Sequence, residues 1–547
     1  MIYSINNSFC KHQVYWQFNY FVKKVTKRSN HNMGKIDSLV YEKLENIKTS
    51  ANRPYYSKLK EQGKMFVRDR IRYLVDEDSI DIENGIFARD KDEQFLPGDA
   101  VVTLVAKING RSVAIIANDL TVKAGTWGVK TIEKIMRMQE LAEKRKIPLI
   151  YMIDSAGARL NEQFDTFIDR RHAGKIFYNT ARISGVVPQV ALVFGSSPAG
   201  SAYLPALCDF VVMVDKNASV YLGSPRMAEM ATGEKVTMEE MGGARMHNQI
   251  SGLGDMLVDN EQDALDAASN YLNFMPQNWT EKVPLKESVE PVPGKEIEEL
   301  VPANQRIPMD MHAVIERIVD ADSFFEFKKL FAKELITGFC RLGGRAVGIV
   351  ANQSKVKGGV IFPESAEKAA HFVSLCDAYN IPLLFLVDLP GFMVGSKVEK
   401  QAIIRRGARM LSTVANATVP RISVIIRKAY GAGYVVMSGA SMQPDACIAL
   451  PQAQPAVMGP EAAVNAMYFN KIQSIEDPEE RQRFIIEQRE KYNNDINVWS
   501  PASELFIDDV VPGDRLRNDL IQRFELYSEN RDTLEGIAER KTVVRRG

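Results

Sequence analysis

Two short stretches of small residues, each directly after an apolar strand pattern, have the composition needed to stabilise an anionic oxygen. "GSSPAGSAY" (195–203) follows "ALVF", and "AYGAGY" (429–434) follows "SVIIRK". Where a strand passes into a helix, the first backbone N–H groups lack partners within the helix, and the helix dipole favours negative charge beside them. Glycine and alanine allow a ligand oxygen to approach closely, so two such N–H groups can form an oxyanion hole. The candidate residues are Ala199, Gly200, Ala432 and Gly433.

The alternative interpretation of each stretch is a tight turn that packs a helix against a sheet. One such loop alone would favour this structural interpretation, whereas two loops at equivalent places in one chain favour a function. Two oxyanion holes suit a reaction with two enolate-like species. Carboxyl transfer from carboxybiotin to a thioester is such a reaction, because loss of CO2 leaves a ureido enolate on biotin and loss of the α-proton leaves a thioester enolate. The biotin nitrogen can serve as the base, so no protein general base is required.

Other catalytic patterns are absent from the sequence. It contains no G-x-x-x-x-G-K-[ST] phosphate loop and no G-x-G-x-x-G dinucleotide fingerprint after a strand. The six histidines never fall at metal-ligand spacing, and His247 in "GGARMH" is better explained as structural. Ser197 lies in "GSSPA", a poor match to the G-x-S-x-G motif. The sequence therefore predicts no metal site and no serine nucleophile.

The sequence patterns of the elements that must position these loops occur twice along the chain. "IPLIYMIDSAGAR" (147–159) pairs with "IPLLFLVDLPGFM" (381–393), and "RSVAIIANDLTVKAG" (111–125) pairs with "RAVGIVANQSKVKGG" (345–359). The offset is 234 residues for both pairs (381 − 147 and 345 − 111). This period is far too long for a solenoid repeat and has the size of a whole domain. The sequence therefore predicts two homologous domains in tandem.

The order of strand and helix patterns within each copy predicts an α/β fold. Apolar strands alternate with amphipathic segments such as 129–146, as in βαβ units, and near-continuous apolar strands are typical of sheets covered on both faces. Six prolines between residues 276 and 308 indicate a connection between the copies. The predicted organisation is a leader at 1–36, an N-terminal domain at 37–290, a proline-rich linker at 291–308 and a C-terminal domain at 309–547.

Composition argues against several classes of protein. The 547 residues carry zero formal net charge, with 45% hydrophobic and 25% charged residues, which is ordinary for a globular protein. Zero net charge gives no general basis for nucleic-acid binding, and no apolar run reaches the roughly 18 residues that would suggest a membrane span. Five widely spaced cysteines without a C-x-x-C pair favour free thiols in a reducing compartment.

The leader has a composition of its own. Residues 1–36 contain six lysines or arginines and no acidic residue. One interpretation is a transit peptide, which would place the protein in the mitochondrial matrix. The other is that translation starts at Met33, since "MGKIDSLVYEKLENIK" is typical of the opening helix of a cytosolic protein. We expect a cytoplasmic protein, with the mitochondrial matrix as the alternative.

Eight motifs occur in order between about residues 60 and 520: "DSAGARL", "GKIFYN", "GSSPAGSAYLPALCDFVVMV", "EEMGGARMH", "GRAVGIVANQ", "DLPGFMVG", "ATVPRISVIIRKAYGAGY" and "PAVMGPEAAV". In this combination the chain resembles the carboxyltransferase (β) subunit of biotin-dependent acyl-CoA carboxylases, the propionyl-CoA and methylcrotonyl-CoA carboxylase group. The resemblance implies two tandem crotonase-like (ClpP/crotonase) domains related by internal duplication. It also implies a homohexamer, with each site between the N-terminal domain of one subunit and the C-terminal domain of another. The chain has no biotin-attachment segment, so carboxybiotin would come from a biotin carboxylase and biotin carrier partner.

The resemblance assigns roles to individual residues. The acyl-CoA oxyanion hole maps to Ala199 and Gly200, and the biotin-side hole maps to Ala432 and Gly433. The other implied residues are Gly157, Ala158, Arg159, Tyr203 and Val435 for the acyl-CoA, and Gly391, Phe392, Gly431 and Tyr434 for biotin. Arg159, Arg170 and Arg171 are candidates for holding the CoA phosphates, although solvated surface charges are the simpler interpretation.

Two departures from the family pattern leave the acyl substrate open. Propionyl-type members usually carry Gly-Gly where this chain has Ala199-Gly200, and "YGGAYD" where it has "YGAGYV". Val435 therefore replaces an aspartate at a position tied to acyl-chain choice, and an apolar residue there would suit a longer or branched acyl group. The alternatives are a biotin-dependent decarboxylase subunit, a crotonase-class hydrolase or isomerase acting alone, and a non-catalytic scaffold. Retention of small residues in both loops argues against the scaffold.

Overall fold

Two β-sheets, one in each half of the chain, organise the residues that the computed structural model describes, which are 35–49, 53, 55–92, 94–529 and 543–544. The first sheet has the order β1-β2-β3-β4-β5-β7-β9 and the second the order β10-β11-β12-β13-β14-β15-β17, with β16 also paired to β14. The predicted leader lies outside the described residues except for its last two positions.

The strands of the first sheet are β1 (Ile82–Glu83), β2 (Val101–Ile108), β3 (Arg111–Asn118), β4 (Leu149–Ile153), β5 (Gln189–Val193), β7 (Phe210–Val214) and β9 (Met256–Val258). Those of the second are β10 (Phe325–Phe327), β11 (Leu335–Leu342), β12 (Arg345–Asn352), β13 (Leu383–Leu389), β14 (Arg421–Tyr430), β15 (Ala446–Ala449), β16 (Gln454–Ala456) and β17 (Asp509–Val510). In each sheet the first strand pairs are antiparallel and the later ones parallel. This shared topology confirms the predicted α/β fold and its internal duplication.

Helices cover both faces of each sheet, as the apolar strands require. Along β4, Ile150 and Met152 join the core beneath one helix layer, while Leu149, Tyr151 and Ile153 join the core on the opposite face. The covering helices of the first unit are α4 (Val67–Leu74) with α12 (Glu261–Phe274), and α5 (Val129–Arg145) with α7 (Gly174–Ile183). Their counterparts in the second unit are α14 (Met311–Ile318) with α22 (Gly513–Glu529), and α15 (Pro363–Ala378) with α17 (Ile403–Asn416).

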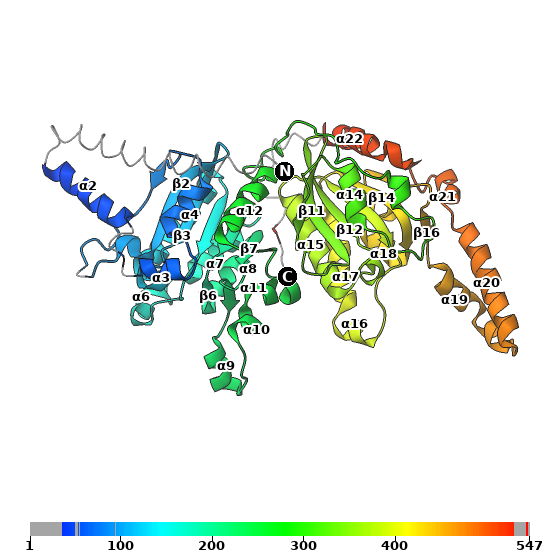
Figure 1. Cartoon of the computed structure of the whole chain (residues 1–547), viewed down its shortest axis with the longest axis horizontal. Helices are drawn as coiled ribbons and strands as arrows, with labels where there is room; N and C mark the ends of the chain where they lie inside the picture. The colour runs from blue at the N-terminus through cyan, green and yellow to red at the C-terminus, as the bar shows by residue number, and fades with distance from the viewer. Residues whose placement is uncertain (1–34, 50–52, 54, 93, 530–542, 545–547) are drawn as a thin grey trace.

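The two units share a buried core in which α12 of the first and α15 of the second lie between the sheets (Figure 1). Aromatic rings dominate this contact: the ring centroid of Tyr271 on α12 lies 5.9 Å from that of Phe339 on β11. The hydroxyl of Tyr379, a fully buried residue of the second unit, donates to Asp209 Oδ2 at 2.6 Å and to the Val187 carbonyl at 2.8 Å. The relative position of the two units is therefore fixed by burial and by hydrogen bonds to buried groups.

The connection between the units contains no helix or strand from residue 282 to 296. Arginines of the second unit satisfy its backbone carbonyls: Arg341 donates to Pro284 and Arg517 donates to Val289. Within the predicted linker 291–308, the short α13 (Ile297–Leu300) buries Ile297 in the core of the second unit. The exact domain limits stay a prediction.

Other helices project away from the sheets. In Figure 1, α9 (Pro225–Thr232) and α10 (Met238–Gly242) extend from the first unit, and the pair α19 (Pro460–Ser474) and α20 (Pro478–Asp495) extends from the second. The N-terminal helices are α2 (Lys35–Lys48) and α3 (Tyr56–Glu61). Among the described residues, no helix is both long and apolar enough to cross a membrane.

A buried lysine recurs at the same repeat position in both units. Lys134 on α5 and Lys368 on α15 are 234 residues apart, and each ammonium donates to backbone carbonyls just before and at the start of the first long strand of its sheet. Lys368 is fully buried and bonds the carbonyls of Lys328, Phe331 and Leu335 at 2.9, 2.8 and 2.6 Å. Burial lowers the pKa of Lys368 to about 7 and that of Lys134 to about 8.

This burial predicts a pH dependence of stability. An unfolded lysine titrates near 10.5, so between about pH 7 and 10.5 the unfolded chain binds more protons at residue 368 than the folded chain does. The contribution of Lys368 to the free energy of unfolding is therefore complete above the unfolded pKa and is lost as the pH falls towards 7. In urea titrations we expect the unfolding free energy of the wild type, minus that of Lys368→Met, to rise from pH 7 to 10. For the exposed control Lys130→Met this difference should not depend on pH. A difference for Lys368→Met that is likewise independent of pH would contradict this assignment.

Candidate functional site

The first small-residue loop is built differently from a direct strand-to-helix turn. After β5 the chain forms the short strand β6 (Ser196–Pro198), which pairs with β8 (Ser219–Tyr221), and then the 3₁₀ helix η4 (Ala199–Ala202) and α8 (Tyr203–Ala206). Ala199 has a φ of 53°, a left-handed conformation that is uncommon for alanine. Ala199, Gly200 and Tyr203 are exposed. The structure thus places these exposed residues at the start of η4 and of α8.

The loop after β4 lies directly beside this helix start. The Ser155 amide donates to the Ser196 carbonyl at 2.9 Å, and the Ser196 hydroxyl donates to the Ser155 carbonyl at 2.8 Å. Gly157 has a φ of 97°, and a Cβ there would lie 3.2 Å from Pro198 Cγ. Gly157 and Ala158, predicted to contact the acyl-CoA, are therefore neighbours of Ala199 in space although some 40 residues separate them in sequence.

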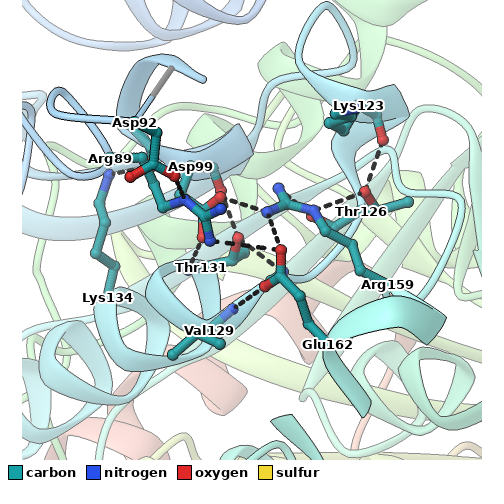
Figure 2. Close-up of polar contacts among 12 residues, drawn as sticks. Arg89, Asp92, Asp99, Lys123, Thr126, Val129, Thr131, Lys134, Arg159 and Glu162 are labelled. Atoms are coloured by element: carbon teal, nitrogen blue, oxygen red, sulfur yellow. Dashed lines mark hydrogen bonds and ion pairs between the residues drawn. The ribbon is translucent and has the colours of Figure 1, made fainter. Parts of the chain in front are cut away.

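Arg159 has a more buried position than its sequence context indicated. Its side chain is 6% exposed and forms an ion pair with Asp99, with Nη1 2.5 Å from Oδ1. It also donates to Thr126 and lies 3.5 Å from Glu162 (Figure 2). Arg170 and Arg171 are exposed. Contact of Arg159 with CoA phosphates stays a prediction, because in this structure its guanidinium is engaged with protein groups.

In the second unit, β14 runs without interruption into α18 (Gly431–Val436), so the predicted strand-to-helix turn is present there. Gly431 adopts a φ of 55° at the first position of this helix, and Ala432 beside it is exposed. Gly433 packs against the loop after β13, since a Cβ there would lie 2.8 Å from Gly391 Cα and 2.7 Å from Leu389 Cδ1. The structure thus brings Gly391 and the Ala432-Gly433 pair together.

The remaining predicted biotin-side residues line or flank the same loop. Phe392 forms a parallel bridge with Ile361 and is half-buried. The Tyr434 hydroxyl accepts from the Ala440 amide at 3.0 Å and lies 3.2 Å from Cys447 Sγ. Burial raises the pKa of Tyr434 above its ordinary value, so this phenol stays protonated at neutral pH and is no candidate for a general base.

A cavity of about 870 Å³ opens beside α18. Gly431, Tyr434 and Val435 form part of its lining, and Leu505 and Phe506 line it as well. The charged residues of its lining are all acidic: Asp495, Glu504 and Asp508. Such a cavity would repel phosphate groups and can accept an uncharged group such as an acyl tail or a ureido ring.

Sequence reasoning missed the buried carboxylates that anchor both loops. Asp154 and Asp388 follow β4 and end β13, 234 residues apart. Asp154 pairs with Lys64 at 3.0 Å and Arg70 at 3.1 Å, and Asp388 pairs with the fully buried Arg427 at 2.8 Å. The signal was present in the repeated "ID" and "VD" of the two copies. These groups hold the strand ends and are not accessible to a ligand.

The two helix starts belong to different sheets and lie in different halves of the chain (Figure 1). Nothing within the described part of the chain groups three or more potential metal ligands, so the geometry offers no metal centre there. At these helix starts Ala199, Gly200 and Ala432 are exposed, whereas Gly433 is buried against the loop after β13.

Comparisons with known proteins show the family to which the chain belongs. Residues 58–540 match the carboxyl transferase domain family. The uncharacterized carboxylase YngE of Bacillus subtilis is 55% identical over 490 residues, covering 89% of this chain and 95% of that protein. The propionyl-CoA carboxylase carboxyltransferase subunit of Haloferax mediterranei is 39% identical, covering 86% and 92%. A crystal structure of transcarboxylase 12S, described as a hexamer with methylmalonyl-coenzyme A bound, superposes with a TM-score of 0.84 at 35% identity, covering 92% and 97%.

These matches span most of the chain and most of each relative, and they confirm the resemblance to carboxyltransferase (β) subunits of acyl-CoA carboxylases. The chain belongs to the carboxyl transferase domain family and is an enzyme.

Proposed function

We propose that this protein transfers a carboxyl group from carboxybiotin, carried on a partner subunit, to the α or vinylogous γ carbon of an acyl-CoA. The observation that carries the proposal is the duplicated placement of small residues: Ala199-Gly200 and Ala432-Gly433 lie in the first turns of short helices at equivalent edges of two duplicated sheets. Amide groups at a helix start have no partner within the helix, so each pair can stabilise one enolate oxygen.

The reaction divides between the two pairs. Ala432 and Gly433 would hold the biotin group, with their amides donating to its ureido oxygen. When its bond to the carboxyl carbon breaks, carboxybiotin would supply both CO2 and the nitrogen that takes the α-proton of the acyl-CoA. At Ala199 and Gly200 the amides hold the thioester enolate, and its carbon attacks CO2 to form the new carbon–carbon bond. No side chain has to act as a base.

The family resemblance also implies how the copies assemble. Within one chain the two helix starts lie in different units, and a complete site would form between the N-terminal unit of one copy and the C-terminal unit of another. The solved relative described as a hexamer supports a homohexamer for this chain too. Biotin would arrive on a biotin carboxylase and carrier partner.

The purified chain can be tested without its partner. We expect it to decarboxylate one of malonyl-, methylmalonyl- or 3-methylglutaconyl-CoA in the presence of free biotin, which runs the transfer in reverse. Turnover that needs biotin would support the proposal and would identify the substrate. Turnover of an acyl-CoA at the same rate without biotin would favour a crotonase-class hydrolase or isomerase.

Val435 gives a specificity prediction. Its side chain lines the apolar part of the cavity beside α18, so Val435→Asp places a carboxylate where a hydrocarbon tail would lie. We expect kcat/KM for a branched or longer acyl-CoA to fall about tenfold relative to a short one. The matched control is Val435→Thr, which keeps the shape without the charge. An unchanged ratio of the two kcat/KM values in Val435→Asp would remove Val435 from acyl selection.

A further inference from the structure

We infer that Arg159 is a positioning residue. It holds the loop after β4, which carries Gly157, against the start of α5. The inference deepens the proposed function, because it assigns the loop at Gly157 and the helix start at Ala199 to the acyl-CoA half of the site. It concerns a buried ionic cluster that we call the Arg159 clasp. The clasp consists of Arg159, Asp99, Glu162 and the first turn of α5 (Figure 2).

The clasp caps α5 with two carboxylates that Arg159 contacts together, while Arg89 also lies 3.4 Å from Glu162. Asp99 Oδ2 accepts from the Thr131 amide at 2.8 Å, and Glu162 Oε2 accepts from the Val129 amide at 3.0 Å. Two of the four orphan amides of the helix start are thereby satisfied by negative charge, as the helix dipole favours. Arg159 Nη1 lies 2.5 Å from Asp99 and 3.5 Å from Glu162, so its charge offsets both carboxylates.

The clasp also holds strained backbone. Gly98, Asp99 and Ala100 have φ values of 63°, 53° and 65°, three consecutive left-handed residues of which two carry side chains. Such conformations persist only where surrounding contacts hold them in place, and they cluster at functional sites. The Lys134 ammonium donates to the Gly98 carbonyl at 2.9 Å, and the Arg159 ion pair fixes the Asp99 side chain.

Backbone hydrogen bonds and aromatic contacts connect Arg159 to the helix start at Ala199. The Arg159 amide donates to the Trp127 carbonyl at 3.0 Å, and the Trp127 amide donates to the Gly157 carbonyl at 2.8 Å. The Trp127 ring lies 6.4 Å from that of Phe177, which in turn lies 6.4 Å from that of Tyr203. A Cβ on Gly200 would be 3.6 Å from Phe177. A shift of the Arg159 backbone would therefore be transmitted through these contacts to the helix start at Ala199.

The second unit lacks the clasp although the fold is repeated. The positions 234 residues after Asp99, Arg159 and Glu162 are Lys333, Met393 and Ser396, which cannot form the same ion pairs. There the loop is held by an apolar contact, because Phe392 packs against α17 so closely that a Cβ on Gly407 would lie 3.0 Å from its ring. The ionic clasp is thus specific to the acyl-CoA half and is not a requirement of the fold.

The test compares Arg159→Lys and Arg159→Ala with a matched control, Arg137→Lys, which changes an exposed arginine of α5 that pairs with Glu133. With the carboxyl-CoA that the wild type uses, we expect kcat to fall about a hundredfold in Arg159→Ala, because a displacement of 1 Å can cost that much. Arg159→Lys keeps the charge but loses the planar guanidinium, so its kcat should lie between those of the wild type and Arg159→Ala. The KM for free biotin should stay unchanged, since the biotin-side loop has its own support.

A second readout does not depend on activity. Amide hydrogen exchange in peptides covering 154–160 and 196–203 should accelerate about tenfold in Arg159→Ala and should not change in Arg137→Lys. Unchanged exchange and unchanged kcat in a folded Arg159→Ala would overturn the inference. A fall in kcat accompanied by an equal rise in the KM for biotin would also overturn it. So would a fall in kcat that is fully explained by a smaller fraction of folded protein. Failure of the wild type to turn over any carboxyl-CoA would instead count against the proposed function, while hydrogen exchange still decides the role of Arg159.

Discussion

Gly433→Ala is expected to lower biotin-dependent turnover about a hundredfold, the effect of moving a reacting group by 1 Å. The added Cβ would lie 2.8 Å from Gly391 Cα and 2.7 Å from Leu389 Cδ1. The Leu389 side chain can rotate away, but the backbone at Gly391 cannot give way without moving the loop after β13. Either that loop or the start of α18 must shift, and both belong to the proposed biotin-side oxyanion hole. The measurement is kcat at saturating carboxyl-CoA with free biotin varied.

Two further variants sharpen this result. Gly294→Ala in the connection between the units is the matched control, because its Cβ would make only an ordinary contact with Arg317 at 3.6 Å. It should keep wild-type turnover and stability. A Gly433→Ala protein that is folded and fully active would show that the position of the α18 start is not critical, and the biotin-side hole would have to be placed elsewhere.

Arg70→Met is expected to lower the free energy of unfolding by about 3–5 kcal/mol, the cost of leaving a buried charge without its partner. Arg70 on α4 is 1% exposed, and its guanidinium contacts Glu261 at 2.6 and 2.8 Å and Asp154 at 3.1 Å. The substitution removes the one arginine that joins these two carboxylates. Asp154 keeps its contact with Lys64, whereas Glu261 loses its arginine and keeps only the hydrogen bond from the Met65 amide.

Urea unfolding measures this loss, and Arg72→Met supplies the control on the same helix. Arg72 is 59% exposed and pairs with Asp69, so its replacement should cost no more than about 1 kcal/mol. Because Asp154 anchors the loop that carries Gly157, we also expect Arg70→Met to lose activity at temperatures where it is still folded. Equal stability of the Arg70 and Arg72 variants would contradict this account of the buried ion cluster.

The duplication and the α/β class could be predicted from the sequence because both rest on patterns that recur along the chain. The 234-residue offset of the two motif pairs recurs outside those motifs in Lys134 and Lys368, and within one of them it relates the buried Asp154 to Asp388. Apolar strands such as β4 and β5 are buried at every residue, as their composition indicated. The strand-to-helix turn at Gly431 is also where the pattern placed it.

Other features depend on contacts between distant segments, which periodicity does not encode. The role of Arg159 in the structure is set by Asp99, sixty residues upstream, whose side-chain direction follows from three left-handed residues that no local motif announces. The extra strand β6 before Ala199 forms only because β8 pairs with it, and "SSP" has no strand signal of its own. The residues of the two oxyanion holes remain a prediction from chemistry and resemblance.

The most direct test of the central claim follows the carboxyl group itself. The purified chain is incubated with carboxyl-labelled carboxyl-CoA and free biotin, and the label is traced at early times. Carboxyl transfer predicts that label appears in acid-labile carboxybiotin in step with the decarboxylated acyl-CoA, and that Gly433→Ala suppresses both. Formation of the acyl-CoA product with all of the label in CO2, at a rate independent of biotin, would contradict the account.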